Sequence, residues 1–243
     1  MALAAWTLVV FAAFSCLTVF RGLISVDVLR ETWIKRLIYF SAPLDPGLVG
    51  RTWAAHALHG AEAALILAAA WGAGAGALRL GRARGSWLAS LGAGLALGGL
   101  AGLGAGLCGL FVPAFAWGRC AGGAALAAAD RRRCAAGWAA LAPALRPAGG
   151  EERALWRILA LMGAVVLLMG LAPEGGWDPA YYHLRLPKLY AMRHKIFFVP
   201  WIFPSHYPQG IEMLYGLGWL LGGEPVAKLL NASFWPACGL ATW

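Results

Sequence analysis

The sequence predicts an all-α protein, a polytopic bundle of transmembrane helices with an extracytoplasmic loop that bears short amphipathic helices. Sixty per cent of the 243 residues are apolar and only 13% are charged, whereas a soluble domain has about 25% charged residues. The apolar residues stand in long runs, and about 20 of them suffice for one helical crossing. The runs do not alternate as the strands of a membrane barrel do, so helices must pair their backbone groups.

Charge and cysteine content narrow the class of partners. The net charge is +9, and the arginines gather in short segments between apolar runs. We interpret them as residues that set membrane topology and contact anionic headgroups. Membrane lipids are therefore expected partners, and nucleic acid is not. The five cysteines form no C-x-x-C pair, so the sequence indicates neither a disulfide framework nor a zinc site.

Residues 1–172 predict four or five spans. The first covers about 2–20 and is interpreted as a retained helix, because no basic segment precedes it as in a signal peptide. Residues 21–52 mix charged residues with Leu, Ile, Val and Trp, which is typical of a helix lying in the membrane interface. A second span is predicted at about 54–78, and three arginines follow it in 79–85.

The uncharged stretch that begins at Ser86 is too long for one crossing and short for two. It predicts either one tilted helix over 86–118 or two helices, 86–107 and 109–129. A polar connection is expected over 130–153, followed by a span at about 154–172.

The C-terminal third predicts a loop and further spans. Residues 173–210 are expected to form a loop of catalytic type, and 211–243 further transmembrane helices that break at 222–225. Both helix counts place 177–209 on the extracytoplasmic side, because the three arginines at 131–133 should be cytoplasmic. The chain is still apolar where it stops, so we expect it to be the N-terminal fragment of a longer protein.

Asp178 has two interpretations that its sequence context leaves open. Asp is a favoured N-cap and Pro179 a favoured first helical residue, so Asp178 can begin a short helix. Alternatively it is a catalytic carboxylate or metal ligand, since a low dielectric at the membrane boundary raises the basicity of a carboxylate. The helix would bury one face, formed by Tyr182, Leu186, Leu189 and Tyr190.

The segment 177–231 resembles the first large extracytoplasmic loop of polytopic glycosyltransferases of the GT-C fold. It is most similar to the RgtA/B/C/D-like group, which is related to protein mannosyltransferases and lipid A aminoarabinose transferases. The resemblance depends on the order of Asp178, Tyr181, Tyr182, His183, Pro187, Tyr190, Tyr207, Pro208, Glu212, Met213, Tyr215, Gly222 and Gly223.

The resemblance implies a transferase in the inner membrane of a bacterium. The donor would be a polyprenyl-phosphate sugar, the acceptor a glycan, a lipid or a protein, and Asp178 the general base. No cofactor is implied. A divalent cation is possible in related members, but Pro179 replaces the second acidic residue of many members, which puts metal binding in doubt. The substrate-binding residues would be Tyr181, Tyr182, His183, Lys188, His206, Tyr207 and Glu212.

Simpler interpretations stand beside these roles. The aromatic and basic residues of the loop suit an interfacial belt, and Glu212 suits the positive end of a helix as well as a second site carboxylate. His56, His59 and Glu62 can form a metal site, a proton relay or a packed cluster. The alternative functions are a transporter or flippase of lipid-linked sugars and a structural membrane subunit.

Overall fold

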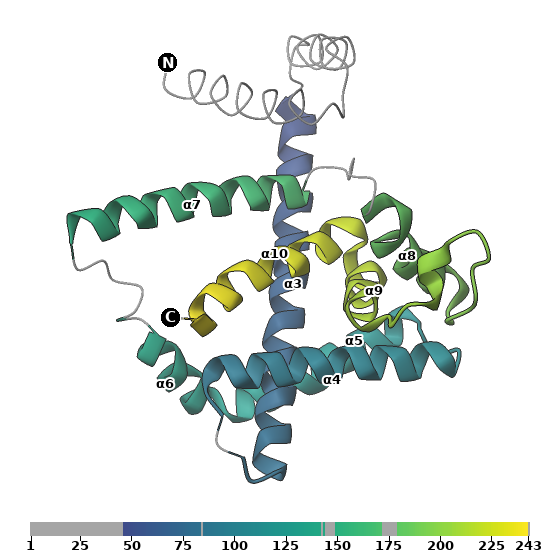
Figure 1. Cartoon of the computed structure of the whole chain (residues 1–243), viewed down its shortest axis with the longest axis horizontal. Helices are drawn as coiled ribbons and strands as arrows, with labels where there is room; N and C mark the ends of the chain where they lie inside the picture. Colours follow the sequence, from purple (N-terminus) through teal and green to yellow (C-terminus); the bar gives the residue numbers. More distant parts are fainter. Residues whose placement is uncertain (1–45, 84, 142, 144–148, 172–178, 243) are drawn as a thin grey trace. The chain divides into compact units, whose positions relative to one another are not determined.

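The computed structural model describes residues 46–83, 85–141, 143, 149–171 and 179–242 (Figure 1). The chain divides into two compact units, 1–52 and 53–243, and the contacts below are those within the second. The predicted span at 2–20 and most of the interfacial segment lie outside the described residues. So does Asp178.

Every regular element in the described residues is helical, which confirms the all-α class. In chain order they are α3 (Pro46–Leu80), α4 (Trp87–Leu107), α5 (Pro113–Ala129), α6 (Arg131–Leu141), α7 (Gly150–Leu171), the π-helical turn η1 (Pro179–His183), α8 (Arg185–Arg193), the 3-10 turn η2 (Phe203–His206), α9 (Gly210–Gly222) and α10 (Glu224–Thr242).

Three of these helices are long and apolar enough to cross a membrane. They are Gly50–Leu80 within α3, α4 and α7. Their positions agree with the spans predicted at 54–78, 86–107 and 154–172, although α3 and α7 each begin several residues earlier. The chain therefore has the helices of a membrane-associated protein.

The two C-terminal helices are not among these three. Helix α9 has 13 residues, so its length is roughly 20 Å, against about 30 Å for a hydrocarbon core. Helix α10 has 19 residues and contains Pro236. The further spans expected in 211–243 stay a prediction.

The uncharged stretch after Ser86 forms two helices, of which α4 is long and apolar enough to cross a membrane and α5 is not, so the prediction of two crossings is confirmed only as a division into two helices. Helix α4 ends before Gly109, whose positive φ of 73° suits a residue without a side chain. Pro113 then occupies the first turn of α5, where its missing N–H costs nothing. The second helix thus begins four residues later than 109, and its 17 residues make it shorter than expected.

The polar connection at 130–153 contains a helix that the sequence analysis did not predict. Helix α6 follows α5 almost directly, and the Cys134 amide donates to the Asp130 carbonyl oxygen. Its alanines favour helix, and the tilted rings of Trp138 and Trp87 hold it to α4, with centroids 5.6 Å apart. The sequence analysis interpreted this segment as a polar connection because of its three arginines at 131–133.

Small residues let α3 approach α4 and α5 at backbone distance. A Cβ atom added to Gly94 would collide with the carbonyl oxygen of Ala70, and one added to Gly123 would collide with that of Ala69. Close packing of this kind is typical of helices in membranes. The glycine richness of α4 is therefore structural at these contacts.

Helix α9 packs on α4, α8 and α10 (Figure 1). Its buried face includes Met213, Leu214 and Leu217, which belong to the main core together with Leu186 and Tyr190 of α8. Where α9 meets α10, the Tyr215 hydroxyl donates a hydrogen bond of 2.8 Å to Asn231 Oδ1. These contacts fix the first turn of α9 beside η1 and α8.

The Tyr215–Asn231 bond gives a first prediction. Replacing Tyr215 with Phe should lower the free energy of unfolding by about 1 kcal/mol, because the part-buried hydrogen bond between α9 and α10 is lost. Denaturant titration of the purified protein in detergent measures this. Tyr207→Phe is the control, since that side chain is half exposed and should change stability little. Equal losses in both variants would contradict the assignment.

Candidate functional site

The candidate site begins with the π-helical turn η1 and helix α8, which follow each other in the chain. The Leu184 amide donates to the Pro179 carbonyl oxygen, which closes the π-helical turn η1. Helix α8 follows and ends at His194, which adopts a left-handed conformation with φ of 59°. Leu186 and Tyr190 are buried on α8, so the predicted apolar face is confirmed for these two residues.

A hydrogen bond between His183 and Glu212 is the centre of the site. His183 Nδ1 lies 2.8 Å from Glu212 Oε1, although 29 residues separate them in the chain. The Glu212 side chain is 4% exposed and that of His183 is 34% exposed. Glu212 Oε2 is buried and has no hydrogen-bond partner among the described residues.

Both sequence interpretations of Glu212 fit its position. The residue lies in the first turn of α9, where the helix dipole favours a negative charge. It is also buried, and burying a carboxylate oxygen that has no hydrogen-bond partner costs free energy. The role of Glu212 as a second site carboxylate stays a prediction.

Tyrosine rings surround this pair. The Tyr182 ring stacks on His183 with centroids 3.8 Å apart, and Tyr181 meets Tyr182 edge-on. Tyr190 lies on the buried side, and its burial, with a smaller contribution from the Glu212 charge, raises the pKa of its phenol. Tyr190 therefore stays neutral at physiological pH and keeps its proton as a hydrogen-bond donor.

Lys188 contacts an aromatic ring. Its Nζ lies 5.4 Å from the centroid of the Trp219 ring, which makes a cation–π contact between α8 and α9. Lys188 was predicted from sequence as a substrate-binding cation, whereas Trp219 was not predicted. A tryptophan in an apolar run gives no signal of such a role, because most such residues are core or interface residues.

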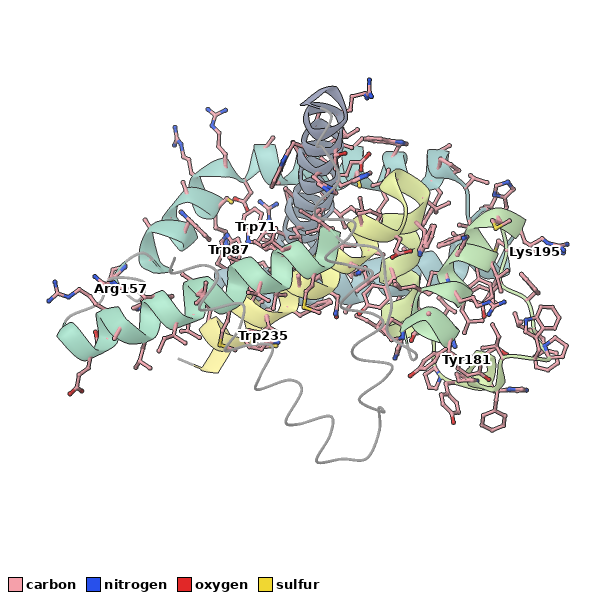
Figure 2. All side chains as sticks on the ribbon, turned by 90° about the horizontal axis from the view of Figure 1, so that it is seen from above. Trp71, Trp87, Arg157, Tyr181, Lys195 and Trp235 are labelled. Carbon is pink, nitrogen blue, oxygen red and sulfur yellow. The ribbon has the colours of Figure 1, made fainter. Side chains whose placement is uncertain are left out.

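His206 and Tyr207 contact aromatic side chains of the segment that precedes α9. The His206 ring packs edge-on against Phe198 with centroids 4.7 Å apart, and its Nδ1 lies 2.9 Å from the Phe203 carbonyl oxygen. Tyr207 is 50% exposed beside Phe203. Figure 2 shows Tyr181 among aromatic rings. The sequence analysis assigned His206 and Tyr207 to the same site as His183, and that assignment stays a prediction.

The segment between α8 and α9 is hydrogen-bonded to the end of α4 and the turn that follows it. The Phe111 amide donates to the His194 carbonyl oxygen, and the Ile196 amide to that of Gly106. Gln209 Nε2 donates to the carbonyl oxygens of Pro204 and Tyr207, which holds the chain just before α9. Hydrogen bonds therefore fix this segment at residues 194–196 and again at 204–209.

The cluster of His56, His59 and Glu62 is only partly assembled. His59 Nδ1 lies 3.2 Å from Glu62 Oε2, whereas the His56 ring packs against Trp53. Among the described residues, no group of three His, Cys, Asp or Glu side chains is placed to hold a metal ion. The four described cysteines are free thiols.

Comparison with known proteins gives a partial match. The chain is 36% identical over 84 residues to an uncharacterized protein of Shigella flexneri, and the match covers 34% of this chain. It spans 42% of that relative, well under half of its length. No protein-family model matches, and no solved structure matches.

Proposed function

We propose that the protein is a membrane glycosyltransferase of GT-C type. It would transfer a sugar from a polyprenyl-phosphate donor to an acceptor hydroxyl on the extracytoplasmic side of a bacterial inner membrane. The observation that carries the proposal is the buried Glu212 carboxylate bonded to His183. The pair stands in the segment that resembles the family's catalytic loop.

The proposed chemistry requires a base and a group that accommodates a phosphate. Asp178 directly precedes η1 in the sequence, and in this proposal it removes the proton of the acceptor hydroxyl. The hydroxyl oxygen then bonds to the anomeric carbon while the bond to the phosphate oxygen breaks. Polyprenyl phosphate leaves, and the configuration at the anomeric carbon inverts.

His183 has the geometry to assist at the phosphate. An ionised Glu212 only accepts hydrogen bonds, so Nδ1 of His183 is then the donor. The carboxylate fixes the orientation of the imidazole, as in other carboxylate–histidine pairs. Nε2 donates a hydrogen bond or a proton to the leaving phosphate oxygen, which gains negative charge as the bond breaks, when the imidazole is doubly protonated, because a neutral ring with its proton on Nδ1 has only an acceptor at Nε2.

Two substitutions test this pair. His183→Gln should lower sugar transfer by about 10²-fold, the lower end of the effect of losing an acid–base group. Glu212→Gln should lower it by about 10-fold, because the imidazole loses its ionic partner. The measurement is release of polyprenyl phosphate from a panel of polyprenyl-phosphate hexoses and pentoses in membranes that contain the protein.

Glu151→Gln is the matched control. Glu151 is also a first-turn carboxylate, in α7, but it is exposed. It should leave transfer unchanged. The proposal is wrong if the His183 and Glu212 variants keep full activity, and a transporter is favoured if lipid-linked sugar crosses the membrane without being cleaved.

A further inference from the structure

Large apolar side chains stand exposed along residues 192–207, which cover the end of α8 and the connection to α9. Between 50% and 67% of each of these side chains is exposed, and they are Met192, Phe198, Trp201, Phe203 and Tyr207. Single exposed apolar residues are normal on a protein surface and need no explanation. A run of them within sixteen residues of sequence calls for one.

The exposed rings of this segment form one cluster. The His206 ring packs against Phe198 with centroids 4.7 Å apart and against Phe203 with centroids 5.8 Å apart. The rings of Phe203 and Tyr207 are also 5.8 Å apart. The cluster is therefore a contiguous apolar patch, and such patches mark surfaces that bind a protein or a membrane.

The backbone beneath the patch is fixed, so the exposure of the rings is part of the fold. Val199 and Ile202 are completely buried in the main core. The Ile202 amide and Ser205 Oγ both donate to the Val199 carbonyl oxygen. Trp201 and Phe203 stand on either side of Ile202 in the chain and are both exposed. These two rings cannot turn inward while Ile202 keeps its place in the core.

The same segment is positively charged. Arg193, His194 and Lys195 are exposed, and Lys195 points outward in Figure 2. The Arg193 guanidinium lies 5.9 Å from the centroid of the Phe197 ring, which places a cation beside the aromatic residues. Over 185–211 the sequence contains Lys and Arg but no Asp or Glu. The charge of the segment is therefore complementary to an anionic surface.

The combination of exposed aromatic rings and basic residues favours a lipid surface over a protein partner. Trp and Tyr are enriched where a membrane meets water, and Lys and Arg lay their apolar stems there and reach the headgroups. Lysine is depleted at protein–protein interfaces. The chain also has three helices that are long and apolar enough to cross a membrane, so a bilayer is within its reach.

We propose that the segment 192–207 binds the interface of a bilayer that contains anionic lipid. Phe198, Trp201 and Phe203 lie among the headgroups and the upper acyl chains, and Lys195 contacts lipid phosphates. The proposal does not depend on the transferase chemistry, because it requires only the exposed rings and the basic residues beside them.

Photo-crosslinking of the full chain in phospholipid nanodiscs tests the contact with lipid. Trp201→p-benzoylphenylalanine places a photoreactive ring where an exposed ring already stands, and Phe203→p-benzoylphenylalanine repeats the test at a second position. Irradiation should add the mass of one phospholipid at both positions. The same probe should also react with lipid at Leu168, an exposed residue of the apolar helix α7. It should react little at Glu151, an exposed carboxylate in the first turn of α7.

A second measurement tests the preference for anionic lipid. In nanodiscs with equal amounts of phosphatidylglycerol and phosphatidylcholine, the probe at Trp201 should favour phosphatidylglycerol about 5-fold relative to the ratio found at Leu168. A basic residue near a membrane surface attracts anionic lipid by about this factor. Adding Lys195→Gln should lower the preference. Adding Arg82→Gln should not, because Arg82 is an exposed cation in the turn after α3.

Each of the following results would overturn the proposal. If neither Trp201 nor Phe203 captures lipid while Leu168 does, or if Glu151 captures as much, the segment faces water. An adduct between two copies of the chain would assign the patch to self-association. A preference for phosphatidylglycerol that is absent, or that Lys195→Gln and Arg82→Gln lower equally, would mean that the basic residues of this segment do not select anionic lipid.

Discussion

Asp178→Asn is expected to reduce sugar transfer by about 10²–10⁴-fold, the range that a positioned general base contributes. Asparagine keeps the size and the hydrogen-bonding oxygen of the side chain but cannot take the acceptor's proton. Binding of the polyprenyl-phosphate donor should persist, because the base acts on the acceptor. The measurements are the transfer rate and, separately, retention of a labelled donor by the purified protein.

The N-cap interpretation of Asp178 predicts a different result. Asparagine is as good an N-cap as aspartate, so a purely structural Asp178 would tolerate the change with full activity. Asp178→Ala would then cost about 1 kcal/mol of stability without a specific loss of transfer. The two variants together thus separate a catalytic carboxylate from a helix cap.

Most of the helical architecture follows from the sequence, because long apolar runs permit few structures. Helices long and apolar enough to cross a membrane occupy 50–80 and 150–171, close to the spans predicted at 54–78 and 154–172, and α4 begins one residue after its predicted start. Helix α6 was not predicted, since the three arginines at its start resemble a loop that sets membrane topology. A hydropathy pattern indicates segments that are long and apolar enough to lie in lipid. It does not indicate a short helix such as α6, which packs against protein.

The candidate site was harder to predict because its key contact joins distant residues. His183 and Glu212 were both named, but nothing in their spacing of 29 residues indicates a 2.8 Å contact. Such long-range geometry depends on packing, which local patterns do not contain.

The packing of α3 against α4 gives the second large effect. Gly94→Ala should lower the free energy of unfolding by about 3 kcal/mol or more, the upper end of overpacking costs. The added methyl group would collide with the Ala70 carbonyl oxygen, and a backbone atom cannot move aside as a flexible side chain can. The helices must separate instead, and the contacts along their whole interface weaken together.

Gly92→Ala is the control within the same helix. A Cβ atom at Gly92 meets nothing within 4 Å, so alanine should raise stability by about 0.5–1 kcal/mol through its better helix propensity. Denaturant titration in detergent should therefore move the two midpoints in opposite directions. Two stabilised variants would mean that α3 and α4 do not touch at Gly94.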